Sequence, residues 1–357
     1  MSDTGGSKRV RHSGLELLRI LAACFVIVLH YNHPNGGGAF RYAASMPLQY
    51  HMLLFCEMLG ICAVNLFVML SGYFRCTSRQ VKLGKILALY LDVIVLAVIQ
   101  YLLKCLLGEA ALKAGALVRC LIPLNWYVAV YTGLYLISPW LNGIIRTQSR
   151  EQFRFMLLVF FFVLSLWPSG VELLSKALDF SPNSLSPISN QGSGDGYTLV
   201  HFILMYFLGA YGRLHGGRSF SRRKGALAVL VYLGCAVVNT VYAHFFLGRA
   251  TSYCNPLVVI QAVALFMVFR NLSIRSKKID AIAGCAFGVY LTHQFFFRFC
   301  QIPRFATGNP FLIPVHVALS AVLIYAAGVL LYGGYRKLFG PLRAYIQKKL
   351  DAFGYET

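Results

Sequence analysis

The stretch LELLRILAACFVIVLHYN, residues 15–32, decides the fold class. It is long and apolar enough to cross the hydrocarbon layer of a bilayer as one α-helix. It also contains Arg19 and His30, and ionisable side chains in a membrane span usually face the interior of a helix bundle. The stretch therefore predicts a transmembrane helix with one functional face.

The rest of the chain has the same apolar character. Of its 357 residues, 58% are hydrophobic and 13% are charged, and that charged fraction is about half of the value usual in soluble domains. We expect an all-α membrane bundle of about ten transmembrane helices, forming a single domain over residues 1–340 and followed by a basic amphipathic tail, 341–357. The predicted spans are approximately 15–32, 50–74, 84–107, 123–145, 153–168, 197–214, 225–247, 253–270, 281–301 and 312–335.

The net charge of +21 follows the expected membrane topology. The basic residues gather in short segments between the apolar runs, which argues against nucleic acid as a partner. If the N-terminus lies in the cytoplasm, 24 of the 33 Lys and Arg residues fall on the inner side and 8 on the outer side, and Arg19 lies within the first span. Because cytoplasmic loops are enriched in Lys and Arg, both termini are predicted to be cytoplasmic.

The spacing between Arg19 and His30 places them on one helix face. Eleven residues at 100° each come within about 20° of three full turns, and the axial separation is about 16 Å. The predicted topology puts Arg19 near the cytoplasmic end and His30 near the outer end. Arg19 alone is also consistent with snorkelling to lipid phosphates, and His30 alone with an ordinary hydrogen-bonding role.

Three further ionisable residues within the predicted spans stand out. Glu57 and His293 are expected in the outer half, at a depth similar to that of His30. A carboxylate at Glu57 is a candidate to orient His30 by accepting its second ring proton, although pairing with another buried donor explains it equally well. Asp92 lies deeper in the membrane and has no evident partner in the sequence.

The ten cysteines do not predict a metal centre. The sequence has no Cys-x-x-Cys pair and no Cys/His spacing typical of metal ligands. Most of the cysteines lie in apolar runs, where they are expected to pack as small hydrophobic residues. Cys105, Cys120, Cys254 and Cys300 lie near predicted helix ends, which leaves a disulfide open.

Several segments together resemble the acyltransferase 3 family of integral membrane proteins. ELLRILAACFVIVLH is similar to the family signature of an Arg and a His separated by ten residues. Four other segments agree in order: CAVNLFVMLSGYF (62–74), WYVAVYTGLYLISPWLN (126–142), GYTLVHFILMYFLGAYGR (196–213) and AFGVYLTHQ (286–294). The last supplies the second family histidine, here His293.

The resemblance implies transfer of an acyl group, often acetyl, from cytoplasmic acyl-CoA to an envelope carbohydrate or other exported acceptor, in the bacterial cytoplasmic membrane. Arg19 matches the family arginine and His30 the family histidine. The segment after the second span corresponds to an arginine-rich family loop but reads Arg75, Arg79, Lys82 and Lys85 here.

The residues suggest how such a transfer would work. Arg19 and the four basic residues after the second span would hold the phosphates of acetyl-CoA. His30 would act as general base on an acceptor hydroxyl or would accept the acyl group itself. Asn65 is a candidate oxyanion donor, and a packing hydrogen bond explains it equally well.

Two other features leave alternatives. Tyr127, Tyr131 and Tyr135 recur every four residues, which fits either an aromatic belt or a sugar-binding face. A transporter or flippase for a lipid-linked or small polar substrate would also place charged residues within the membrane.

Overall fold

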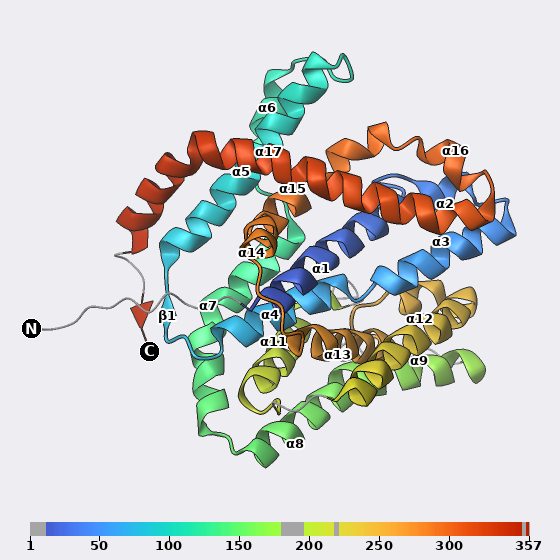
Figure 1. The fold of residues 1–357 in the computed structure, drawn as a ribbon, viewed down its shortest axis with the longest axis vertical. Helices are drawn as coiled ribbons and strands as arrows, with labels where there is room; N and C mark the ends of the chain where they lie inside the picture. The colour runs from blue at the N-terminus through green and yellow to red at the C-terminus, as the bar shows by residue number, and fades with distance from the viewer. Residues whose placement is uncertain (1–11, 180–195, 218–220, 352–354, 357) are drawn as a thin grey trace, which may run out of the picture.

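The computed structural model describes residues 12–179, 196–217, 221–351 and 355–356, and it is nearly all helical (Figure 1). The N-terminal half contains α1 (Ser13–Asn32), α2 (Ala39–Tyr42), α3 (Pro47–Gly60), α4 (Ala63–Arg75), β1 (Gln80–Val81), α5 (Leu83–Leu106), α6 (Ala114–Cys120), α7 (Trp126–Thr147), α8 (Arg150–Phe161), the π-helical η1 (Phe162–Leu166) and α9 (Trp167–Ala177). The C-terminal half contains α11 (Leu199–Leu214), α12 (Arg222–Ala250), α13 (Pro256–Arg270), α14 (Lys277–Ala283), α15 (Ala286–Phe296), η4 (Phe297–Phe299), α16 (Ile302–Ala306), η5 (Pro310–Leu312), α17 (Ile313–Leu350) and β2 (Tyr355–Glu356).

The helices agree with the predicted membrane character. Within the described residues, seven helical segments are long and apolar enough to cross a bilayer, and they overlap seven of the predicted spans. Two other predicted spans correspond to α11 and α13, which are apolar but shorter. The predicted span 281–301 is instead divided among α14, α15 and η4. The count of ten crossings and the orientation stay predictions.

Helix α1 forms the axis of the bundle. It contacts α3, α4, α13, α14, α15 and α17, and it lies in the middle of Figure 1. One side, with Leu15 and Leu18, joins a hydrophobic core shared with α4, α11 and α13. The other side, with Ile27 and Tyr31, joins a second core shared with α3, α15 and α17. Because both sides are covered by protein, the polar residues of α1 face the bundle interior.

Helices α4 and α11 pack through two small residues. A Cβ atom at Gly72 would overlap the carbonyl oxygen of Tyr206, and one at Gly209 would overlap the carbonyl oxygen of Met69. Such close approach is typical of membrane helix pairs, whose association depends on backbone packing. The pair fixes α4, and with it the basic segment that follows.

We expect Gly209→Leu to destabilise the protein, because the new side chain must push α4 away. Overpacking of this kind costs about 1–3 kcal/mol, which thermal unfolding in detergent would detect. Gly143→Leu on α7 is the matched control, since nothing lies within 4 Å of a Cβ atom there. Equal unfolding midpoints for the two variants would contradict the packing argument.

The C-terminal part of α17 is attached to the bundle. The helix continues through Pro341 to Leu350, and β2 then pairs with β1 in antiparallel register. Asp92 on α5, which is completely buried, accepts hydrogen bonds from Tyr332 (2.9 Å) and Tyr335 (2.7 Å) on α17. It also forms an ion pair of 3.0 Å with Arg343. Residue 340, the predicted domain boundary, therefore lies inside one helix.

Candidate functional site

A cavity of about 1070 Å³ runs beside α1 and is lined by both Arg19 and His30. Val26 and Leu29 lie between them on the same wall. The rest of the lining comes from α3, α4, α5, α7, α15 and the connection between α12 and α13. The helical spacing predicted a shared face for Arg19 and His30, and the structure shows that this face opens into one cavity.

His30 meets His293 at one end of the cavity. The two rings come from α1 and α15, and their centroids lie 4.7 Å apart. His30 Nδ1 lies 2.9 Å from the carbonyl oxygen of Val26, and His293 Nδ1 lies 2.7 Å from that of Tyr290. A carbonyl only accepts, so each Nδ1 carries the proton and each Nε2 keeps a free lone pair. His293 Nε2 is buried and has no hydrogen-bond partner among the described residues.

Glu57 also lines the cavity, and its partner is a buried donor other than His30, the second of the two alternatives that the sequence left open. Its Oε2 accepts a hydrogen bond of 2.8 Å from Asn32 Nδ2, which ties α3 to α1. The ring proton of His30, for which Glu57 was one candidate acceptor, is held by the carbonyl of Val26, one turn earlier. A backbone carbonyl cannot be recognised from residue identity, which explains why the sequence suggested a carboxylate.

The other end of the cavity is cationic. Arg19 forms an ion pair of 2.6 Å with Glu16, one turn earlier on α1. Arg75, at the end of α4, lies over the ring of Tyr135 at 4.0 Å and donates to Ser138 Oγ at 3.1 Å. Among the described residues, Arg75 has no carboxylate in ion-pair range. Its positive charge is therefore available to an anion.

The other basic residues of this segment lie outside the cavity lining. Arg79, Lys82 and Lys85 are exposed, and the structure does not bring their side chains to the cavity wall. The backbone near Lys82 is fixed, because its amide donates to Tyr135 Oη at 3.2 Å. The structure thus separates Arg19 and Arg75 from the other three predicted donor-binding residues.

Asn65 does not line the cavity and lies in a packing contact. Its Nδ2 donates to the carbonyl oxygen of Tyr253 at 2.9 Å, and its Oδ1 lies 2.9 Å from His201 Nε2. These bonds hold the connection between α12 and α13 against α4 and α11. The arrangement favours the packing alternative for Asn65 over an oxyanion donor.

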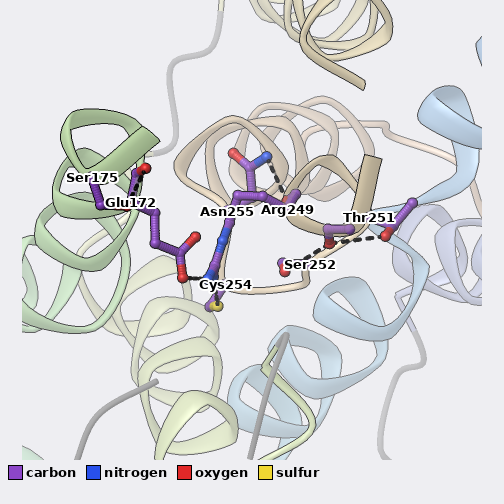
Figure 2. A network of polar contacts seen from close by, with 8 residues as sticks. Glu172, Ser175, Arg249, Thr251, Ser252, Cys254 and Asn255 are labelled. Carbon is purple, nitrogen blue, oxygen red and sulfur yellow. Dashed lines mark hydrogen bonds and ion pairs between the residues drawn. The ribbon is translucent and has the colours of Figure 1, made fainter. Parts of the chain in front are cut away.

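The same connection is held from its other side by a polar network (Figure 2). Arg249 forms an ion pair with Glu172 of α9 and lies 3.9 Å from Cys254 Sγ. Asn255 Nδ2 donates to the Arg249 carbonyl at 3.2 Å. Leu247, in the last turn of α12, and Tyr253, in the connection, line the cavity. The network therefore positions one of its walls.

Aromatic side chains form much of the wall near His30. Tyr127, Tyr131 and Trp126 of α7 line the cavity, as do Tyr197 and Tyr253. The Trp126 ring lies 4.4 Å from that of Tyr197 and stacks on Tyr253 at 6.2 Å. The tyrosine repeat on α7 thus faces the bundle interior. Tyr197 and Tyr253 precede helices without any periodic pattern, so no sequence signal indicated them.

The described residues contain no group of three or more His, Cys, Asp or Glu side chains arranged to hold a metal ion. The ten cysteines, all of which lie in the described part of the chain, are free thiols.

The comparison with known families agrees with the geometry. The family model described as an acyltransferase domain matches residues 12–333, which include every residue of the cavity lining. No curated protein and no solved structure matches the chain at a significant level. The match spans nearly the whole chain, and seven of its helical segments are able to cross a membrane. The protein is a membrane protein that belongs to the acyltransferase 3 family.

Proposed function

We propose that the protein transfers an acetyl group from acetyl-CoA to a hydroxyl of a carbohydrate or lipid-linked carbohydrate at the outer side of the bacterial cytoplasmic membrane. The observation that supports this best is one cavity lined by Arg19 and Arg75 and also by His30, whose ring packs against the buried His293 behind it. The two arginines are suited to bind an anion, and His30, the candidate proton acceptor, lies about 16 Å from Arg19 along α1.

The donor matches this distribution of charge. Coenzyme A has an anionic nucleotide portion and an uncharged arm that ends in the thioester. Guanidinium groups bind phosphate oxygens through paired hydrogen bonds, so Arg75, together with Arg19, would hold the nucleotide portion. Phe67, Leu70 and Phe74 of α4 line the cavity and would enclose the arm.

His30 then serves as the general base. Its Nε2 takes the proton from the acceptor hydroxyl, whose oxygen forms a bond to the thioester carbonyl carbon. The carbon–sulfur bond breaks, and the coenzyme A thiolate leaves and is protonated. His293, whose ring packs edge-on against that of His30, would hold the His30 ring in place for this proton transfer. In a second route, His30 Nε2 first takes the acetyl group and then passes it to the hydroxyl.

The aromatic wall near His30 would receive the acceptor. Trp126, Tyr197 and Tyr253 line the same cavity as His30 and present flat rings, to which the two tyrosines add phenolic hydroxyls. Such surfaces combine apolar contact with hydrogen bonding, which suits the two kinds of surface on a sugar ring.

The test of this function is a reconstitution. Purified protein in proteoliposomes receives labelled acetyl-CoA on the Arg19 side and envelope glycans on the His30 side. We expect a mass increase of one acetyl group on a glycan, detected by mass spectrometry. Movement of an unmodified substrate across the membrane, without acetylation, would favour the transporter alternative and contradict the proposal.

Within the basic segment, we expect Arg75→Ala to raise the KM for acetyl-CoA by about 10- to 100-fold, because a charge-assisted hydrogen bond contributes about 1.5–3 kcal/mol. Arg19→Gln should act in the same direction. Arg79→Ala is the matched control, since it removes an exposed arginine of the same segment that does not line the cavity. A larger effect at Arg79 than at Arg75 would contradict the assignment.

A further inference from the structure

His51 and His244 form a second histidine pair, separate from the cavity lining. His51 lies in the first turns of α3 and His244 lies near the end of α12, and both side chains are exposed. Their rings have centroids 5.5 Å apart, with His51 Nε2 3.4 Å from His244 Nδ1. The two residues are 193 positions apart in sequence, so no local spacing indicates the pair.

The hydrogen bonding of His51 fixes which of its two ring nitrogens is directed at His244. His51 Nδ1 donates to the carbonyl oxygen of Pro47 at 2.6 Å. Its proton is therefore on Nδ1, and the lone pair of Nε2 faces His244. Histidines that bind metal ions almost always donate their second ring nitrogen to a carbonyl or carboxylate in this way.

The separation of the two nitrogens fits a shared ion. Zinc–nitrogen bonds are about 2.0–2.1 Å long, which places two tetrahedral ligands about 3.3–3.4 Å apart. The observed 3.4 Å agrees with that edge, whereas hydrogen bonds from N–H donors are usually about 2.7–3.2 Å long. Both rings are exposed, so water can complete the coordination.

We propose that His51 and His244 bind a divalent transition-metal ion of the zinc type, bridging α3 to α12. Imidazole nitrogens suit Zn²⁺, Ni²⁺ and Cu²⁺ and disfavour Mg²⁺ and Ca²⁺. The neighbour of His51, Tyr50, lines the large cavity, and so does Leu247, three residues after His244. The ion would therefore clamp two helices that form the cavity rim. This proposal does not depend on the proposed acyl transfer.

The test is calorimetric titration of the purified protein with Zn²⁺ alone, after removal of any histidine tag. We expect one ion per chain, and a loss of affinity of about 10- to 100-fold in His51→Ala and in His244→Ala. The double variant should be no weaker than either single variant, because both residues serve one site. Mg²⁺ should give no binding heat.

The matched variant His244→Asn distinguishes the metal site from a plain hydrogen bond. An asparagine amide can still donate to His51 Nε2, but it is a poor zinc ligand. If the two histidines bind a metal ion, His244→Asn should lose Zn²⁺ binding and should unfold at the same temperature as the metal-free wild type. His215→Ala, a change at the C-terminal end of α11, should bind Zn²⁺ as the wild type does. Wild-type binding no tighter than that of the double variant would overturn the proposal.

Discussion

His30→Ala is expected to reduce acetyl transfer by about 10²- to 10⁴-fold, the range typical of removing a general base. His30 presents an unprotonated Nε2 to the cavity, because its Nδ1 is committed to the Val26 carbonyl. Alanine leaves the rest of the cavity wall in place, so binding of acetyl-CoA at Arg19 and Arg75 should change little. Labelled acetyl-CoA would measure transfer, and equilibrium dialysis would measure donor binding in the same preparation.

The controls for this prediction separate His30 from its neighbours. His215→Ala removes a histidine that packs beside Phe153 and Tyr211, away from the cavity, and should keep full activity. His293→Ala should lower transfer less than His30→Ala does, because His293 acts through the position of the His30 ring. Full transfer by His30→Ala would refute its role as base or acyl carrier.

Asp92→Ala is expected to destabilise the protein by about 2–6 kcal/mol, because each of two buried hydroxyls left without its acceptor costs about 1–3 kcal/mol. The carboxylate is completely buried, accepts hydrogen bonds from Tyr332 and Tyr335, and forms an ion pair with Arg343. Its removal leaves two buried phenolic hydroxyls without their acceptor and a guanidinium without its partner. Thermal unfolding in detergent should show a clear loss of midpoint.

Two variants make the Asp92 prediction specific. Tyr335→Phe removes one hydrogen bond from the same carboxylate and should cost only about 1 kcal/mol. Asp351→Asn changes a partly exposed aspartate near the end of α17 and should have little effect. If Asp92→Ala unfolded at the wild-type temperature, the network would not be holding α17 to α5.

The sequence predicts those features that depend on local periodicity. Helical spacing placed Arg19 and His30 on one face, and hydropathy located α1, α5, α7 and α12 to within a few residues. It did not locate the partners of Asp92, because they lie on a helix about 240 residues further along the chain. It also did not foresee the interruption between α14 and α15, where an apolar run continues through a break in the helix.

In the candidate site, too, the sequence indicated individual residues, whereas their contacts depended on the fold. The pattern of apolar spans placed His293 at a depth similar to that of His30, and the contact between the two rings required the fold. For Glu57 and Asn65 the sequence indicated a buried polar side chain correctly, but several partners were chemically equivalent. Arg75 lines the cavity and Arg79 does not. Their spacing of four residues in the sequence does not determine which of the two side chains reaches the cavity.

The pairing of Glu16 with Arg19 bears on how the protein is made. His293 is synthesised about 260 residues after His30, which at ordinary elongation rates is a delay of roughly 10–50 seconds. During that interval the later helices that will surround α1 have not yet been synthesised. Glu16 lies one turn from Arg19 and is present from the start. Helix α1 can therefore enter the membrane with the charge of Arg19 already balanced, before the later helices that surround it have been synthesised.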